Sequence, residues 1–427
     1  MTDFQVFNMF QNARGTRDTM PDEMIRFQYV IDVIKRIYEK YGFDPLDTPV
    51  FEEWGLLSAK QGGGEEIKQE IYYFKDKSER ELGLRFDLTV PLARVFVNNP
   101  QLPLPFKRYQ IAKVWRYDKP GANRWREFWQ ADIDVVGSES IEAEAECLKA
   151  ICEIFYELGF SDFSIRINNR KTVEAFVKSV DVKDYVDVFR SVDKMDKIGE
   201  DGVRKELEGK GVEEDKIKKI LEFIKIRNIE DARKFVSEGL DELETITSLL
   251  KDYGKNISVD MSLVRGLEYY TGPVFEVTLG EGLPSVGGGG RYDNLTESVG
   301  GKKIPATGIS LGVDRIVSVM GERGMFNFGK TVCNVFVIAV NEKVKSSVID
   351  VTEKIRKNGI AAEFDLMNRS LSKQLDYASS RGIPYVIVIG DKELQSGKAK
   401  VRDMKTGEEK DISLNELEEI KKIIGQL

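Results

Sequence analysis

The sequence predicts an α/β protein of two or three domains, and three patterns support this. Two runs of alternating polar and apolar residues, 107–115 and 128–136, flank a polar turn. A stretch of helix-forming residues with alternating charge covers 171–253. Strand and helix patterns then alternate from residue 331 onward. Several domains are expected because 427 residues are too many for one ordinary core.

The composition predicts the cellular compartment of the protein. Its 41% hydrophobic and 32% charged residues, with a net charge of -8, describe a soluble, folded chain. No run approaches the roughly 18 apolar residues of a membrane span, and the first residues lack the basic and apolar regions of a signal peptide. A cytoplasmic protein without a membrane partner is therefore predicted.

The chain contains no histidine, which excludes a His-based catalytic triad, a His general base and a His-rich metal site. The three cysteines, Cys147, Cys152 and Cys333, have a spacing that fits neither a disulfide framework nor a zinc site, so no zinc is expected. Catalysis must then rest on arginines, carboxylates, the backbone, bound Mg²⁺ or the substrate itself.

The first predicted elements are a loop, a helix and an extended segment. The polar loop Asn12–Asp18 precedes a helix from about Pro21 to Tyr41, since Asp22 can cap this helix and apolar residues recur at helical spacing. The segment from Phe43 to Glu53 contains two prolines and therefore favours a sheet edge or a boundary over a central strand.

A glycine-rich loop at 61–66 and a strand at 71–75 follow, and residues 84–91 lead into a second helix. Asp87 and Thr89 lie at the mouth of that helix. A carboxylate and a hydroxyl at this position commonly cap a helix, so capping is one interpretation and substrate binding is the other.

The hairpin-like unit from Phe106 to Gly137 concentrates positive charge. Between its strands lies a turn rich in Asp, Pro, Gly and Asn, the composition of a tight reversal. Its cations from 107 to 126 are Lys107, Arg108, Lys113, Arg116, Lys119, Arg124 and Arg126, against the single acid Asp118. Arg116 ends the first strand and Arg126 begins the second, and the planar, multiply donating guanidinium groups of such arginines can bind a polyphosphate. Two alternatives to phosphate binding remain. The charged hairpin tip is simply solvated, and its aromatic residues are part of the core.

Further patterns follow the hairpin. They predict a helix at 142–158, a strand at 163–168, the helical stretch 171–253, and strands at 257–264 and 274–279. The last two strands enclose Arg265–Gly272, which brings together an arginine, two adjacent tyrosines and open backbone. Hairpin packing of the tyrosines is the alternative. A glycine run at 288–290 and a strand-to-helix change at 307–316, which includes Arg315, come next.

The C-terminal part is predicted as a small α/β domain with a mainly parallel sheet. Its predicted strands are 331–340, 361–366, 385–389 and 398–403, and its predicted helices are 344–358, 370–381 and 414–424.

These motifs resemble the class II aminoacyl-tRNA synthetases, in the form found in histidyl-tRNA synthetases. The hairpin resembles motif 2, through Arg116, Arg124-Trp125-Arg126-Glu127-Phe128, Gln130 and Asp134. The segment 43–53, with Pro49, resembles motif 1. The segment 307–316 resembles motif 3, with Asp314 where the family has Glu. L-V-R-G-L-E-Y-Y-T-G at 263–272 and G-G-G-R-Y-D at 288–293 resemble the two signatures of the histidine-specific enzymes.

The resemblance covers nearly the whole chain and implies its architecture. It implies a catalytic α+β domain at 1–329 on a mainly antiparallel sheet, a tRNA-clamping helical insertion at 171–253, and an anticodon-binding domain at 330–427. Motif 1 implies a homodimer. The implied reaction ligates L-histidine to its tRNA with ATP and Mg²⁺. The alternative is a non-catalytic, histidine-sensing paralogue of the same fold, but such paralogues typically lack the C-terminal domain and degrade the signatures, and this chain keeps both.

The resemblance also implies residue roles. Arg116 and Arg265 are expected to be catalytic. ATP would be bound by Arg116, Arg124, Arg126, Arg265 and Arg315. Asp87, Thr89 and Gln130 would hold the α-amino group of histidine, while Asp134 and Tyr270 would bind its imidazole. The full histidine-binding set is Asp87, Thr89, Arg116, Gln130, Asp134, Arg265, Tyr269 and Tyr270. The metal ligands are not predicted.

Overall fold

The computed structural model describes residues 11–59, 70–119, 121, 124–182, 184–264, 270–280 and 282–414. The chain divides into two compact units. The first comprises Met1–Arg17 and Tyr29–Met325, and the second Asp18–Gln28 and Phe326–Leu427. No helix in the described residues is both long enough and apolar enough to cross a membrane.

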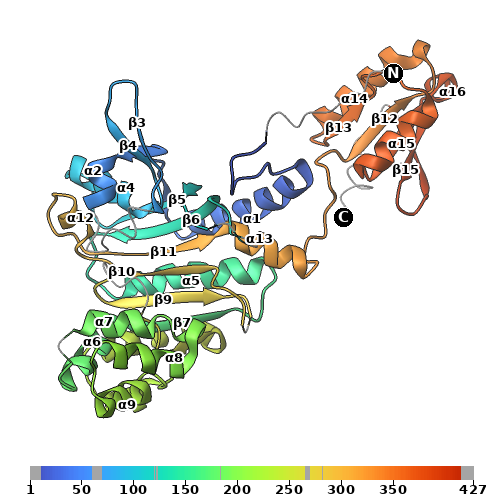
Figure 1. Cartoon of the computed structure of the whole chain (residues 1–427). Coiled ribbons are helices and arrows are strands. Elements are labelled where there is room, and N and C mark those ends of the chain that lie inside the picture. The colour runs from blue at the N-terminus through green and yellow to red at the C-terminus, as the bar shows by residue number, and fades with distance from the viewer. Residues whose placement is uncertain are drawn as a thin grey trace, which may run out of the picture. The chain divides into compact units, whose positions relative to one another are not determined.

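A large sheet forms the centre of the first unit. Its described strands number eight and run in the order β1-β5-β6-β11-β10-β9-β7-β8 (Figure 1). They are β1 (Asp44–Pro45), β5 (Phe106–Trp115), β6 (Glu127–Val136), β7 (Ser164–Asn169), β8 (Ile257–Val259), β9 (Pro273–Thr278), β10 (Gly287–Arg291) and β11 (Ala306–Gly312). Only the two outermost pairs, β1 with β5 and β7 with β8, are parallel. The predicted mainly antiparallel sheet is confirmed, and Pro45 lies in an edge strand as expected.

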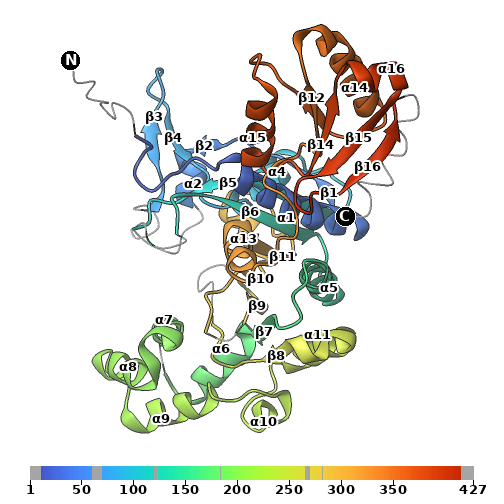
Figure 2. The same ribbon diagram turned by 90° about the vertical axis from the view of Figure 1, so that its right-hand side faces the viewer.

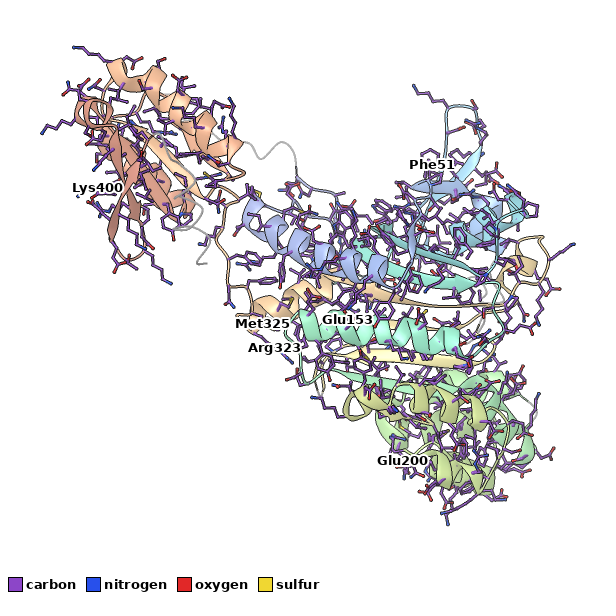
Figure 3. The ribbon with its side chains drawn as sticks, turned by 180° about the vertical axis from the view of Figure 1, so that it is seen from behind. Phe51, Glu153, Glu200, Arg323, Met325 and Lys400 are labelled. Atoms are coloured by element: carbon purple, nitrogen blue, oxygen red, sulfur yellow. The ribbon has the colours of Figure 1, made fainter. Side chains whose placement is uncertain are left out.

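The hairpin β5–β6 is the longest ladder of this sheet, with Phe106 opposite Val136 and Trp115 opposite Glu127. Successive residues of β6 face opposite sides of the sheet. Ala131 and Ile133 are buried on one side, where Figure 3 shows α1 (Pro21–Lys40) and α5 (Glu142–Glu157) along the strands. The Tyr38 hydroxyl of α1 donates to the carbonyl of Ala131 at 3.1 Å. The other side is left for polar side chains.

Strand β10 contains the glycine run 288–290 and ends at Arg291. It lies in the middle of the sheet, between β9 and β11. A Cβ atom on Gly289 would lie 2.1 Å from the carbonyl oxygen of Gly308 on β11, so only glycine fits there. Close approach of two backbones, rather than a turn, explains this glycine.

The predicted strand 257–264 is shorter than expected, and the strands on either side of 265–272 do not form the hairpin that was the alternative interpretation. Strand β8 ends at Val259 because the carboxylate of Asp260 accepts from the backbone N–H of Ser262 at 2.9 Å and from its hydroxyl at 2.6 Å, which makes a turn. Strands β8 and β9 then lie on opposite sides of β7 rather than pairing with each other.

Helices fill the stretch between β7 and β8, as its composition predicts. They are α6 (Arg170–Ser179), α7 (Tyr185–Val192), α8 (Met195–Gly209), α9 (Glu214–Phe223), α10 (Ile229–Arg233), α11 (Leu240–Leu249) and the 3₁₀ helix η1 (Lys251–Asn256). Figure 2 shows them gathered beside β7 and β8. Their core includes Phe176 stacked on Phe223, with ring centroids 3.9 Å apart.

A small sheet and four further helices complete the described part of the first unit. The sheet has the order β2-β4-β3, from Phe51–Glu53, Glu81–Leu84 and Tyr73–Lys75. The helices are α2 (Trp54–Ala59), α4 (Thr89–Asn98), α12 (Leu295–Ser298) and α13 (Val313–Glu322). The predicted loop at 61–66 lies outside the described residues.

The second unit has its own sheet, in the order β13-β12-β14-β15-β16. Its elements are β12 (Val335–Ala339), η2 (Glu342–Val344), α14 (Lys345–Lys357), β13 (Ala362–Phe364), α15 (Leu371–Arg381), β14 (Tyr385–Ile389), α16 (Asp391–Ser396), β15 (Lys398–Asp403) and β16 (Glu409–Ser413). The prediction of a mainly parallel sheet is wrong, because β14–β15 and β15–β16 are antiparallel. A six-residue helix and a tight turn at Asp403 are too short for parallel crossovers. The predicted closing helix lies outside the described residues beyond Leu414.

Candidate active site

A cavity of about 250 Å³ opens on the polar side of the large sheet. Its lining comes from the tip of the β5–β6 hairpin, from β6, β10 and β11, and from the start of α13. The lining residues are Arg116, Asp118, Arg124, Trp125, Phe128, Gln130, Ser285, Val286, Gly287, Gly288, Ser310, Gly312, Asp314 and Arg315. Four residues of the predicted site, Arg116, Arg124, Gln130 and Arg315, therefore meet at one cavity although they lie far apart in the sequence.

The three arginines of the cavity are held by the protein itself. Arg116 donates from Nε to the carbonyl of Phe86 at 3.0 Å and lies 5.4 Å from the centroid of the Phe128 ring. Arg124 contacts the carboxylate of Asp118 through Nε at 3.0 Å and Nη2 at 2.6 Å. Arg315 donates to the carbonyl of Ser285. Guanidinium groups fixed in this way are prepared to bind a polyphosphate.

Arg126, which the sequence placed with the ATP-binding residues, does not line the cavity. Its Nε donates to the carbonyl of Asp118 at 3.0 Å, and its guanidinium lies 3.9 Å from the centroid of the Tyr117 ring. Its backbone N–H donates to the carbonyl of Gly15 at 2.8 Å. Arg126 therefore braces the hairpin tip against the loop 12–18.

The loop 12–18 also contacts Asp314, the residue that stands where the family has Glu. Arg17 lies 4.8 Å from the centroid of the Trp125 ring and 3.7 Å from the carboxylate of Asp314. The other oxygen of Asp314 accepts from the backbone N–H of Trp129 at 2.7 Å. Asp314 thus ties the start of α13 to β6.

Gln130, Asp132 and Asp134 alternate along β6 and share the polar side of the sheet. Asp134 is buried, with 3% of its surface exposed; its carboxylate lies 2.7 Å from the guanidinium of Arg108 and accepts from the Tyr292 hydroxyl. It does not line the cavity itself.

Asp132 is a site residue that the sequence analysis missed. Burial raises the pKa of its carboxyl to about 7; the positive charge of Arg108 opposes the rise and the negative charge of Asp134 adds to it. The signal was present, because two aspartates separated by one residue on a strand must share a face.

The side chain of Asp87 follows the capping interpretation, whereas Thr89 is the first residue of α4 and contributes its backbone N–H. The carboxylate of Asp87 accepts from the backbone N–H groups of Thr89 at 3.2 Å and Val90 at 2.9 Å, at the start of α4. Neither Asp87 nor Thr89 lines the cavity. Asp87 is near enough to Asp132 for its charge to contribute to the raised pKa of that carboxyl.

The loop between β8 and β9 carries three predicted site residues. Arg265 and Tyr269 lie outside the described residues. Tyr270 is described and lies over β10, where a Cβ on Gly290 would be 3.0 Å from its ring. The backbone before the loop is held by Asn168, which donates to the carbonyls of Met261 and Leu263 at 3.2 and 2.9 Å.

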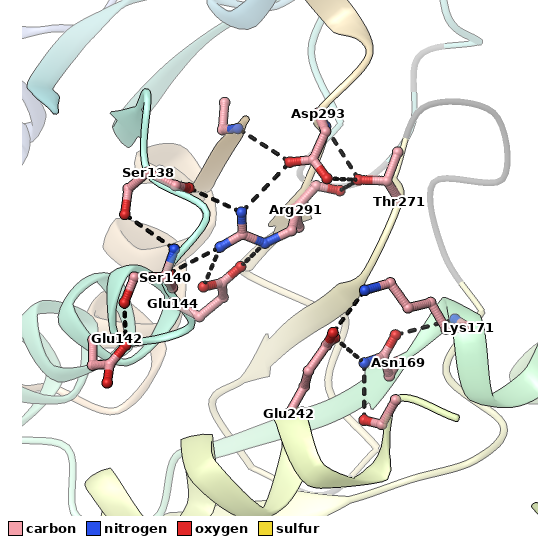
Figure 4. A network of polar contacts seen from close by, with 12 residues as sticks. Ser138, Ser140, Glu142, Glu144, Asn169, Lys171, Glu242, Thr271, Arg291 and Asp293 are labelled. Atoms are coloured by element: carbon pink, nitrogen blue, oxygen red, sulfur yellow. Dashed lines mark hydrogen bonds and ion pairs between the residues drawn. The ribbon is translucent and has the colours of Figure 1, made fainter. Parts of the chain in front are cut away.

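The second signature, Gly288–Asp293, has a structural role beyond its glycines (Figure 4). Arg291 forms a two-pronged ion pair with the buried Glu144 of α5, at 2.6 and 2.8 Å, and donates to the carbonyls of Ser138 and Ser140. Asp293 accepts from the Thr271 hydroxyl at 2.9 Å. This network anchors α5 and the end of the loop that carries Tyr270.

Comparison with known families identifies the family to which the chain belongs. The family model described as histidyl-tRNA synthetase matches residues 15–316. The chain belongs to the histidyl-tRNA synthetase family. A second model, described as an anticodon binding domain, matches residues 334–422. The matches together reach from the loop 12–18 into the second unit.

Members of this family resemble the chain over nearly its full length. The histidine–tRNA ligase of Clostridium tetani is 42% identical over 94% of this chain and 95% of its own. The crystal structure of the histidyl-tRNA synthetase from Nostoc sp. PCC 7120 superposes with a TM-score of 0.86 at 33% identity, over 97% of this chain and 99% of that one. A Bacillus halodurans chain titled as a phosphoribosyltransferase regulatory subunit/histidyl-tRNA synthetase shares the fold, at 22% identity and a TM-score of 0.74 over 89% and 98% of the two chains. The higher identity and fuller coverage of the ligase and synthetase relatives support the synthetase interpretation over the regulatory alternative.

A substitution at Gly288 tests whether the cavity is the reaction site of this synthetase. A Cβ at Gly288 would approach only the carbonyl oxygen of Phe275, at 3.5 Å, so a side chain there extends into the cavity without a clash in the protein. We expect Gly288→Val to keep the thermal midpoint and to lower kcat/KM for adenylate formation by roughly 10- to 100-fold, the range for about 1–3 kcal/mol of overpacking. Gly209→Val on α8, where a Cβ meets nothing within 4 Å, is the matched control. Normal activity of Gly288→Val would place the reaction elsewhere.

Proposed function

We propose that this chain activates L-histidine with ATP and then esterifies the 3′-terminal ribose of its tRNA. In the first step a carboxylate oxygen of histidine attacks the α-phosphorus and diphosphate leaves. In the second step the ribose hydroxyl attacks the histidyl carbonyl, AMP leaves, and a phosphate oxygen of the adenylate takes the hydroxyl proton. The observation that carries the proposal is the convergence of Arg116, Arg124 and Arg315 with Gln130 on one cavity in a chain of this family. Neither step needs an imidazole base, which is consistent with a chain that contains no histidine.

The arginines are assigned to the phosphates. Arg116 contacts the α-phosphate and the substrate carboxylate, and Arg265 reaches the α-phosphate from the opposite side. Arg124 and Arg315 hold the distal phosphates, and Arg126 acts on ATP through the hairpin tip that it braces. Preorganised donors of this kind stabilise the charge that develops at phosphorus.

Mg²⁺ would supply further neutralisation of the triphosphate. The two carboxylates of the cavity wall are already engaged, Asp118 by Arg124 and Asp314 by Arg17 and the backbone of Trp129. We therefore propose that the phosphate oxygens and water, rather than these side chains, supply most of the ligands of the ion.

Histidine recognition is assigned to residues of β6, of the start of α4 and of the loop before β9. Asp87, Thr89 and Gln130 would hold the α-amino group, and Tyr269 belongs to the same histidine-binding set. Asp134 and Tyr270 would bind the two imidazole nitrogens. An amino acid with an apolar side chain would leave both of these groups unpaired, and a site of this kind discriminates strongly.

Histidine-dependent exchange of diphosphate into ATP tests the proposal, since a histidine-sensing regulator does not catalyse it. Asp134→Asn is the informative variant, because Asp134→Ala would leave the buried Arg108 without its partner. We expect Asn to raise the KM for histidine by roughly 10- to 100-fold, about 1–3 kcal/mol for one mismatched buried hydrogen bond, and to change the KM for ATP by less than about twofold. Equal losses for both substrates would contradict the imidazole assignment.

The partners follow from the same assignment. The second unit would contact the anticodon, and the reaction would take place in the cytoplasm. We propose a homodimer through the small sheet, whose exposed apolar side chains include Val50, Phe51, Tyr73 and Phe74 (Figure 3 labels Phe51). Burial of such a patch in a second copy removes apolar surface from water.

A further inference from the structure

Three polar side chains meet at the floor of the cavity. Asp132 on β6 lies directly opposite Ser310 on β11. The amide nitrogen of Gln130 donates to Ser310 Oγ at 3.0 Å, and the Ser310 hydroxyl is close enough to the carboxylate of Asp132 to lower the pKa of that carboxyl. Gln130 and Ser310 line the cavity, whereas Asp132 lies behind them with 3% of its surface exposed.

We propose that Asp132 and Ser310 are positioning residues that fix the Gln130 amide with its carbonyl oxygen toward the α-ammonium group of the substrate. The inference rests on the proposed function, in which Gln130 contacts that group. It adds two residues that do not touch the reacting atoms and act through Gln130.

The argument depends on how many hydrogens each group carries. A serine hydroxyl has one hydrogen, and an ionised carboxylate only accepts. The negative charge of the ionised Asp132 favours the orientation in which the Ser310 hydrogen points toward it, and Ser310 Oγ is left to accept from the Gln130 NH₂ group. The amide oxygen of Gln130 then has to face away from Ser310. This series of contacts fixes which end of the Gln130 amide is the oxygen and which is the nitrogen.

The oxygen presented in this way needs a donor. Within the described parts of the chain, Gln130 Oε1 is buried and has no hydrogen-bond partner. A buried acceptor without a donor is costly, and a charged N–H group is the strongest donor that could satisfy it. The α-ammonium group of histidine has this chemistry, whereas its carboxylate does not.

The charge on Asp132 gives the relay a pH dependence. The charged groups that face it are Arg108 from β5, Asp134 from β6 and Asp87 before α4, with the Tyr38 hydroxyl of α1 also within electrostatic reach. Gln110 lies opposite on β5 and is neutral. Burial raises the pKa of Asp132 to about 7. Below that pH, the protonated carboxyl can donate to Ser310, the serine can donate to the Gln130 oxygen, and the amide is free to turn.

The competing interpretation is that Ser310 only satisfies a buried aspartate. Ligands that differ by one group separate the two interpretations. Histidinol has the ammonium, hydroxymethyl and imidazole groups, and imidazolepropanol differs from it only in lacking the ammonium group. The ratio of their dissociation constants, measured by calorimetry on the full chain, reports the ammonium contact. The imidazole pKa differs between the two ligands, so each dissociation constant is corrected for the fraction of neutral imidazole.

We expect Ser310→Ala to weaken histidinol about tenfold at pH 8, the effect of losing one oriented bond to a charged group, and to leave imidazolepropanol within about twofold. Ser310→Thr, which keeps the hydroxyl, should restore the ratio. Lowering the pH from 8 to 6 should reduce the ammonium preference of the unmodified chain. Asp132→Asn should remove this pH effect, because an asparagine side chain does not titrate in this range.

Two results would overturn the relay. One is an equal loss of both ligands in Ser310→Ala, which a merely structural role predicts, and the other is unchanged binding of both ligands in that variant. These results are distinct from failure of the proposed function, which would appear as absent histidine-dependent diphosphate exchange in the unmodified chain.

Discussion

Arg116→Ala is expected to slow the formation of histidyl-adenylate by about 10²–10³-fold, the range for losing one preorganised transition-state donor. The loss should fall mainly on kcat, because the guanidinium is assigned to charge that grows at the α-phosphorus. Arg265→Ala is expected to show a loss of the same size. Single-turnover adenylate formation measures this step without the contribution of product release.

Arg126→Ala is the matched control, since it removes the same charge from the same hairpin. Its guanidinium contacts the backbone carbonyls of Asp118 and Arg14 and the ring of Tyr117, and Arg126 itself does not line the cavity. We expect a rate loss of less than about tenfold, accompanied by a lower thermal midpoint. An Arg116→Ala rate near that of the unmodified chain would remove the role assigned to Arg116.

Arg291→Met is expected to lower the free energy of unfolding by about 3–5 kcal/mol, because it leaves the fully buried Glu144 without its partner. Denaturant unfolding measures the change. The deficit should shrink as the pH falls, since an unpaired buried carboxyl has a raised pKa and regains stability once it is protonated.

Two comparisons sharpen this result. The double variant Glu144→Leu with Arg291→Met removes both charges and should recover much of the loss. Arg204→Met removes an ion pair with the exposed Glu214 and should cost less than about 1 kcal/mol. A change of that small size in Arg291→Met would show that the second signature is kept for contacts other than this ion pair.

Local patterns predicted the hairpin and much of the site. Alternation along 107–115 and 128–136 gave strand ends within one residue of β5 and β6. The position of Gln130 on the polar side of β6 follows from the same alternation. The sequence did not separate Arg124 from Arg126, because the turn at Gly121 and Arg124 decides which of the two guanidiniums enters the cavity.

Interactions between distant segments decided what the sequence left open. The glycine run of β10 has no strand propensity of its own and is extended because it fits between β9 and β11. The turn at Asp260 ended β8 early through a bond to Ser262 that alternation does not reveal. In the second unit, the lengths of the connections set the strand directions, and periodicity says little about strand direction.

The helical stretch between β7 and β8 has a consequence for how the chain can vary. These strands are parallel neighbours, with Ile165 opposite Ile257, so everything between them is topologically one crossover connection. Such a connection needs only about a dozen residues. Asn169 donates to the carbonyl of Gly239 at 3.0 Å and so ties the start of the stretch to a point near its end. Insertions, deletions or whole exchanged modules between these points would leave the strand register intact, which makes this segment the part of the molecule freest to diverge in length.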